Sequence, residues 1–216
     1  MLSRDQIKTL YDHVGARQDR GARYEDPAVA QLIRHADFEH ASAVFEFGCG
    51  TGRLAAALLG QHLPQYASYY GVDLSTTMVH LASAKIAPWC DRAVVSQTGG
   101  VLQLPARDGS IDRFVSAYVL DLLSTEDIEA LLAETRRVLR PDGKLCLASL
   151  TYGQTLPTRL VSWGWSQIYA CNPARLGGCR PIILRDFLHD GWVLQHAEVI
   201  AAVGMSSEVV VAVPRT

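Results

Sequence analysis

The chain has 216 residues, of which 49% are hydrophobic and 19% are charged, and its formal net charge is −2. This length suits one domain with a substantial core and leaves little room for a second. The nearly balanced charge argues against a nucleic-acid partner, because binding phosphates requires a clear basic excess.

The cysteines and the apolar segments indicate the compartment. Five cysteines, at positions 49, 90, 146, 171 and 179, include no C-x-x-C pair, which is typical of reduced thiols. No segment approaches the roughly 18 uninterrupted apolar residues of a membrane span. The first six residues show no apolar stretch suited to a signal peptide. We therefore predict a cytoplasmic protein without a membrane span.

The first 40 residues predict two helices. Residues 3–14 carry apolar side chains at helical spacing, and Ser3 is a plausible N-cap. Residues 15–24 are rich in charge and glycine and are expected to form a loop. Asp26 then caps a second helix, with Pro27 in its first turn, which runs to about Ala36.

The next stretch predicts a ligand-binding turn. An apolar run, Ala43–Phe47, carries one acid at Glu46 and is followed by Gly48, Cys49, Gly50, Thr51 and Gly52. Residues 53–59 then form a helix. A strand, a glycine turn and a helix in this order place backbone N–H groups at the carboxyl edge of a sheet, where a nucleotide-like ligand binds.

The glycine spacing and the acid narrow the choice of ligand. The dinucleotide fingerprint is G-x-G-x-x-G, whereas the present turn is one residue tighter. A carboxylate at Glu46 would repel a pyrophosphate but suits a ligand that carries a positive amine.

The sequence E-x-G-x-G-x-G resembles motif I of the class I S-adenosylmethionine-dependent methyltransferases. The resemblance covers roughly residues 40–150 and includes two later landmarks, the segments 98–112 and 137–145. It implies an α/β fold: a doubly wound, seven-stranded, mostly parallel Rossmann-like sheet with an antiparallel edge hairpin and helices on both faces. It also implies S-adenosylmethionine as cofactor, with S-adenosylhomocysteine as product, held at its amino-acid end by Glu46 and the turn.

The second predicted strand, residues 67–72, ends at Asp73. An acid at this position can accept hydrogen bonds from ribose hydroxyls. Ser75 caps the next helix, residues 76–87. Leu74 and Met78 either flank the expected adenine or pack in the core.

A third strand, residues 93–97, leads into Gly99, Gly100 and Val101, which we expect beside the adenine. Many members of the resembling family have an acid where this chain has Gly100. Without that acid, a backbone carbonyl or a neighbouring side chain would have to accept the hydrogen bond from the adenine amino group.

The acceptor side offers several candidates. Asp121 follows the fourth strand, residues 113–118, and either acts as a base or orienting group or hydrogen-bonds backbone. Tyr11 and His13 either belong to a lid over the cofactor or have packing and surface roles. Tyr118, at the end of the strand, is expected to touch cofactor or substrate.

The remaining segments complete the predicted sheet. A helix capped by Ser124 runs to Leu139, and a fifth strand spans residues 144–150. Helices are expected at 156–169 and 182–189, followed by strands at 192–201 and 207–213. The first of these helices carries large apolar side chains that either cover a lipophilic acceptor or belong to the core: Trp163, Trp165, Ile168 and Tyr169. The loop that follows it contains Arg175 and Arg180, which we expect to meet an anionic head group of the acceptor.

These features predict one domain, residues 1–216, with an N-terminal helical lid (1–40), a cofactor-binding core (41–150), a helical substrate-side insertion (151–191) and closing strands (192–216). We expect a methyltransferase that acts by in-line displacement on a small, lipophilic acceptor such as a quinone-like ring, a lipid or a secondary metabolite, with peripheral lipid contact. A protein or RNA methyltransferase and a non-catalytic cofactor-binding partner are the alternatives. The seven histidines show no paired metal-ligand spacing, so no metal is predicted.

Overall fold

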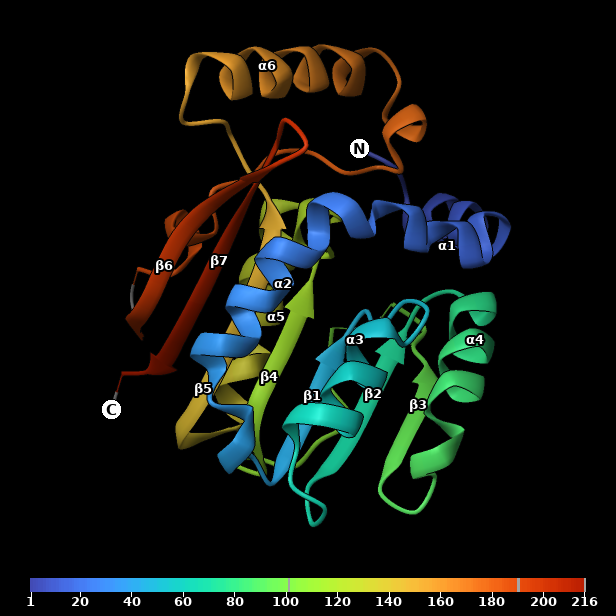
Figure 1. The fold of residues 1–216 in the computed structure, drawn as a ribbon, viewed down its shortest axis with the longest axis vertical. Helices are drawn as coiled ribbons and strands as arrows, with labels where there is room; N and C mark the ends of the chain where they lie inside the picture. The colour runs from blue at the N-terminus through green and yellow to red at the C-terminus, as the bar shows by residue number, and fades with distance from the viewer. Residues whose placement is uncertain (101, 190, 216) are drawn as a thin grey trace.

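Seven strands form a single sheet in a computed structural model that describes residues 1–100, 102–189 and 191–215 (Figure 1). Their order across the sheet is β3-β2-β1-β4-β5-β7-β6. The first five strands in that order are parallel, and β7 runs antiparallel to β5 and to β6. The predicted fold class is therefore confirmed. The strands are β1 (Ala43–Phe47), β2 (Ser68–Asp73), β3 (Ala93–Gln97), β4 (Ile111–Ala117), β5 (Leu139–Leu150), β6 (Trp192–Ala202) and β7 (Met205–Pro214).

Helices cover both faces of this sheet (Figure 1). They are α1 (Arg4–Val14), α2 (Ala22–Ala36), α3 (Arg53–Ala57), α4 (Thr76–Ile86), α5 (Thr125–Val138) and α6 (Leu156–Cys171). Among the described residues, no helix combines the length and the hydropathy needed to cross a bilayer.

Alternate side chains of each central strand enter two separate cores, as the period of two along a strand requires. In β1, Val44 packs with α2 and α3 on one face, whereas Phe45 packs with α5 on the other. β4 behaves in the same way, with Val115 in the first core and Phe114 in the second. Both faces of β1 and β4 are therefore buried, and Asp112 and Arg113, at the start of β4, are buried with hydrogen bonds to Ser42 and to the Ala36 carbonyl.

The order of the strands reverses between β1 and β4, since β1 lies next to both β2 and β4. Ligands of doubly wound sheets bind outside the carboxyl ends of the strands at such a point. The glycine turn follows β1 directly, so the sequence places it at this position.

Several predicted boundaries were wrong. Helix α2 begins at Ala22 rather than at Asp26, so Pro27 lies inside its second turn, and residues 15–21 form a 3-10 helix rather than a loop. The predicted helix 182–189 is reduced to a 3-10 turn, Leu184–Phe187. Residues 58–62 continue α3 as a π-helix. Strand β5 already begins at Leu139, with a register shift that accommodates the expected turn at 141–143.

Candidate active site

A cavity of about 500 Å³ opens at the carboxyl ends of β1, β2 and β4. The glycine turn forms its floor, and α1 and the start of α2 form its cover. Many of the predicted site residues line it: Tyr11, Glu46, Gly48, Cys49, Gly50, Thr51, Asp73, Leu74, Gly100 and Tyr118. The structure thus brings together, around one space, residues that lie more than a hundred positions apart.

The glycines of the turn adopt backbone conformations that other residues avoid. Gly48, Gly50 and Gly52 have φ angles of +79°, +52° and +75°, in the left-handed region that favours glycine. A Cβ on Gly48 would lie 2.2 Å from Val119 Cγ2, and one on Gly52 would lie 2.7 Å from the Cα of Ala82 in α4. Gly52 therefore permits helix packing, whereas Gly48 keeps the turn against the end of β4.

Glu46 is a buried carboxylic acid in the cavity wall. Its side chain is almost completely enclosed, and its Oε2 accepts a hydrogen bond of 2.5 Å from the Tyr69 hydroxyl. Burial raises the pKa of Glu46 to about 7, although the Tyr69 hydrogen bond lowers it. A cationic group next to this carboxyl would restore its charged form, so the position suits a ligand amine.

Asp73 holds the glycine turn from the neighbouring strand. Its Oδ2 accepts from the Gly50 N–H at 2.8 Å and its Oδ1 accepts from the Ser75 N–H at 2.9 Å. Burial raises the pKa of Asp73 while both backbone hydrogen bonds oppose that rise. Each carboxylate oxygen has further lone pairs, which leaves acceptor capacity for ligand hydroxyls.

Only some of the residues that were predicted to contact the adenine line the cavity. Leu74 and Gly100 line the cavity together with Thr98, but Gly99 does not. Met78 is fully buried and packs inside the protein, so its role is in the core. Val101 lies outside the described residues. A Cβ on Gly100 would lie 3.0 Å from Arg4 Cδ, so the aliphatic part of Arg4 occupies the space beside Gly100 that a side chain would need.

The N-terminal segment is fastened over the cavity by two carboxylates. Asp12 Oδ1 accepts from the Ser75 hydroxyl at 2.6 Å and from the Thr77 N–H at 3.1 Å, at the start of α4. Asp19 Oδ1 accepts from the Thr51 hydroxyl at 2.6 Å. Hydrogen bonds from Lys8 and Ser75 hold the pKa of Asp12 well below its usual range. Tyr11 therefore faces the cavity, whereas His13 on the same helix is exposed and does not line it.

Glu25 and Arg53 form an ion pair in the cavity wall that was not anticipated from the sequence. Arg53 Nη2 lies 3.0 Å from Glu25 Oε2, and Arg53 Nη1 binds Asp26. Burial raises the pKa of Glu25, and Arg53 opposes that rise. The two residues belong to different helices, so no local spacing could have paired them.

Tyr118 occupies a strained position beside this pair. Its φ is +58°, which is uncommon for a residue other than glycine and is found preferentially at functional sites. Its hydroxyl donates to Ser207 Oγ at 2.7 Å, and its ring makes an edge contact with Tyr24 at 5.8 Å. This hydrogen bond to a residue of β7 fixes the aromatic ring of Tyr118 at the carboxyl end of β4.

Asp121 lies behind the cavity wall rather than in it. Its side chain is 1% exposed, and neither carboxylate oxygen has a hydrogen-bond partner among the described residues. Burial raises the pKa of Asp121 to about 7. Arg180 is tied to the same region, since its Nη2 donates to the Leu123 carbonyl at 2.8 Å. In this conformation Asp121 has no direct path to a ligand in the cavity.

Within the described part of the chain, two histidine-containing groups could offer three metal ligands, and both lie outside the cavity lining. One contains Asp37, Glu39 and His40, and the other contains His35, His196 and Glu198. The rings of His35 and His196 stack at 3.6 Å and 10°. Nitrogen lone pairs lie in the ring planes, so parallel rings do not converge on one ion.

The charges around the cavity favour a cationic ligand. Among the described residues that line it, five are acidic and three are basic: Asp19, Glu25, Asp26, Glu46 and Asp73 against Arg4, Lys8 and Arg53. A pyrophosphate would meet repulsion here, whereas a sulfonium with an ammonium group would be attracted.

The fold and the cavity define a class of protein: a Rossmann-like α/β protein with a motif I glycine turn and acids at the ends of β1 and β2. A family model described as a methyltransferase domain matches residues 44–143. The chain belongs to the class I S-adenosylmethionine-dependent methyltransferase superfamily.

Sequence relatives agree with this assignment. A malonyl-[acyl-carrier protein] O-methyltransferase of Laribacter hongkongensis is 32% identical over 155 residues, which cover 68% of this chain and 51% of the relative. A demethylmenaquinone methyltransferase of Lactobacillus johnsonii is 31% identical over 126 residues, 58% of this chain and 49% of the relative. The chain thus spans about half the length of these relatives.

Solved structures share the fold over nearly the whole chain. The [4+2]-cyclase SpnF is similar with a TM-score of 0.75 and 15% identity, covering 100% of this chain and 98% of that one. A geranyl diphosphate methyltransferase in complex with GPP and sinefungin gives 0.73 and 14%, covering 97% and 98%. Since a cyclase has this fold too, an assignment of chemistry depends on the residues of the cavity.

Proposed function

We propose that this chain transfers a methyl group from S-adenosylmethionine to a small, largely apolar acceptor. One observation carries the proposal: the cavity that contains the acidic glycine turn is otherwise lined largely by apolar side chains. Val29, Leu54 and Ala57 come from α2 and α3, and Val119, Leu122 and Leu123 come from the segment after β4.

The turn residues fit the cofactor. Glu46 would face the ammonium group, the N–H groups of the turn would face the carboxylate, and Asp73 would accept from the ribose hydroxyls. Leu74 and the aliphatic part of Arg4 would enclose the adenine. When bound, the sulfonium supplies an electrophilic methyl group.

The protein's own task is then to hold the acceptor in line with that methyl group and to exclude water. The fastened N-terminal segment closes the cavity, and Tyr118 and Tyr11 fix aromatic surfaces along it. Glu25 is the carboxylate on the acceptor side of the lining, and it is placed to receive a proton from a hydroxyl acceptor. Burial raises the pKa of Glu25, which strengthens it as a base, and Arg53 opposes that rise.

Two sequence relatives are named for acceptors with an acyl or apolar portion, malonyl-[acyl-carrier protein] and demethylmenaquinone. The largely apolar lining of the cavity suits an acceptor with such a portion.

Transfer of labelled methyl from S-adenosylmethionine into fractionated cell extract tests the proposal. We expect label in an organic-soluble or small polar fraction, and its loss with Glu46→Gln. Label in protein or RNA instead would support the alternative methyltransferases. Binding of S-adenosylhomocysteine without any transfer would support a non-catalytic partner.

A further inference from the structure

Helix α6 has its polar side inward and its apolar side outward. The buried residues of this helix are Thr158 and Ser162, and both make internal hydrogen bonds. Ser162 Oγ accepts from the Gly153 N–H at 3.1 Å, and Thr158 Oγ1 accepts from the Thr155 N–H at 3.1 Å. This arrangement is the reverse of an ordinary surface helix.

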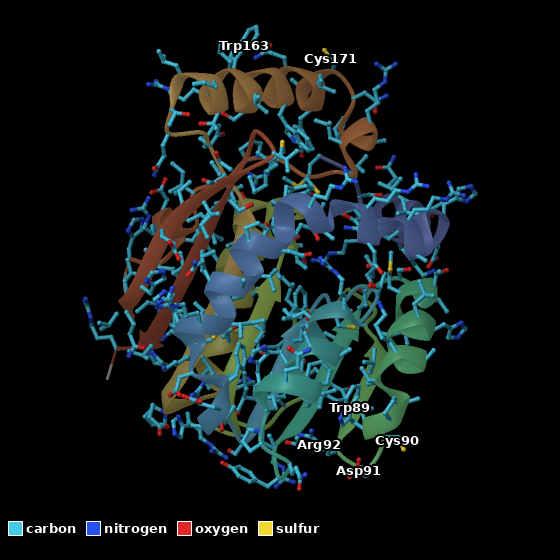
Figure 2. The ribbon with its side chains drawn as sticks, in the orientation of Figure 1. Trp89, Cys90, Asp91, Arg92, Trp163 and Cys171 are labelled. Atoms are coloured by element: carbon cyan, nitrogen blue, oxygen red, sulfur yellow. The ribbon has the colours of Figure 1, made fainter. Side chains whose placement is uncertain are left out.

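The outward residues are large and apolar. Leu156 is 77% exposed, Leu160 69% and Trp163 65%. Figure 2 shows Trp163 projecting from the outer side of α6, away from the sheet. The predicted aromatic roof over the acceptor is thus wrong for Trp163. We call these three outward residues of α6, Leu156, Leu160 and Trp163, the apolar crest.

The charge of the surrounding segment is strongly one-sided. No acidic residue occurs between Asp142 and Asp186, whereas this stretch contains Lys144, Arg159, Arg175, Arg180 and Arg185. Arg159 lies on α6 beside the apolar crest, and Arg175 is exposed in the loop that follows. Lys144 and Arg185 are ion-paired with Asp37 and Glu208, and Arg180 donates to the Leu123 carbonyl, so Arg159 and Arg175 are the two of these five residues that can attract an anionic partner beside α6.

We propose that the apolar crest docks onto the surface of an anionic lipid bilayer. Interfacial helices combine projecting Leu and Trp side chains with basic residues, and they bind by burying the former and by attracting acidic head groups with the latter. Helix α6 stands off the end of the sheet as a convex ridge (Figure 1). A fluid interface accepts such a ridge without a matching groove, and a second copy would bring like charges together.

The crest is connected to the acceptor side of the cavity. Trp165 Nε1 donates to the Cys179 carbonyl at 2.9 Å, and the Cys179 Sγ lies 3.9 Å from the Tyr11 hydroxyl. Tyr11 lines the cavity. Docking would therefore bring the acceptor side close to the bilayer, an implication that rests on the proposed function. Docking itself requires neither cofactor nor acceptor.

Vesicle co-sedimentation of the full chain tests this proposal. We compare vesicles of phosphatidylcholine with vesicles that also contain phosphatidylglycerol. The test variant is Leu160→Ser/Trp163→Ser, and the matched control is Tyr66→Ser, an aromatic residue that is 72% exposed just before β2, at the opposite end of the strands from α6.

We expect binding to the anionic vesicles, weaker binding to the neutral ones, and wild-type binding by Tyr66→Ser. The double variant should lose about a hundredfold or more in partition coefficient, since each buried side chain contributes about tenfold or more. Its S-adenosylhomocysteine affinity and melting temperature should stay unchanged, because both side chains are exposed.

Three results would overturn the proposal: no sedimentation with anionic vesicles, equal sedimentation of the double variant, or self-association in the absence of lipid that the double variant abolishes. Because the assay contains no cofactor, its failure leaves the proposed methyl transfer untouched.

Discussion

The substitution Gly48→Ala tests the geometry of the glycine turn. The new methyl group would lie 2.2 Å from Val119 Cγ2, at a residue whose φ is +79°. A left-handed conformation costs an alanine about 1–2 kcal/mol, and overpacking adds about 1–3 kcal/mol. We expect a loss of about 2–5 kcal/mol in the free energy of unfolding, with weaker cofactor binding because the turn must shift.

Gly50→Ala provides the matched control. This glycine has a φ of +52°, but a Cβ there would meet no heavy atom within 4 Å. The loss should therefore be limited to the backbone cost of about 1–2 kcal/mol. Both variants restrict the unfolded chain equally, so that effect cancels in the comparison.

Urea unfolding of the four proteins of a double-mutant cycle, with Val119→Ala as the second substitution, measures the clash itself. Removing both methyl groups of Val119 should relieve part of the strain and give a favourable coupling of about 1 kcal/mol. The reasoning is refuted if Gly48→Ala is no less stable than Gly50→Ala, or if Val119→Ala adds its full cost in both backgrounds.

Three further predictions concern acidic side chains in and around the cavity wall. Burial raises the pKa of Glu46 to about 7, and the protonated acid cannot attract an amine. The affinity for S-adenosylhomocysteine, measured by calorimetric titration, should therefore fall by up to about tenfold per pH unit below pH 7. An affinity that stays constant from pH 8 to pH 5.5 would contradict this. Asp12→Ala should increase amide hydrogen exchange across residues 4–14 and accelerate cofactor dissociation, whereas Asp5→Ala on the same helix should not; equal effects would show that Asp12 does not fasten the lid. Glu25→Gln should lower kcat/KM by about tenfold or more at unchanged cofactor affinity, in a methyl-transfer assay over pH; an unchanged rate would remove Glu25 from the acceptor side.

Local sequence patterns predicted the arrangement of the glycine turn and Asp73. Gly48, Gly50 and Gly52 are adjacent in sequence, and the end of a strand fixes the position of Asp73, so a short motif describes their arrangement. The pairing of Glu25 with Arg53 and the contact of Tyr11 with Cys179 join distant segments. Contacts between distant segments leave no periodic pattern in the sequence, so they could not be predicted from it.

The sequence pattern also could not predict which side of α6 faces the rest of the protein. Apolar residues at helical spacing normally face a core, yet those of α6 face outward because Thr158 and Ser162 fill the inner side. For Asp121 the sequence left two roles open, an acceptor-side group or a partner of the backbone, and the 3-10 turn Leu120–Leu122 buries its side chain.

Calorimetric titration with S-adenosylhomocysteine at pH 8 tests the central claim most directly, by comparing the wild type with Glu46→Gln and Asp73→Asn. We predict saturable binding to the wild type at a stoichiometry near one, and a loss of about tenfold or more in each variant, since each removes a charged acceptor of ligand hydrogen bonds. Absence of binding to the wild type, or equal affinity in all three proteins, would contradict the account.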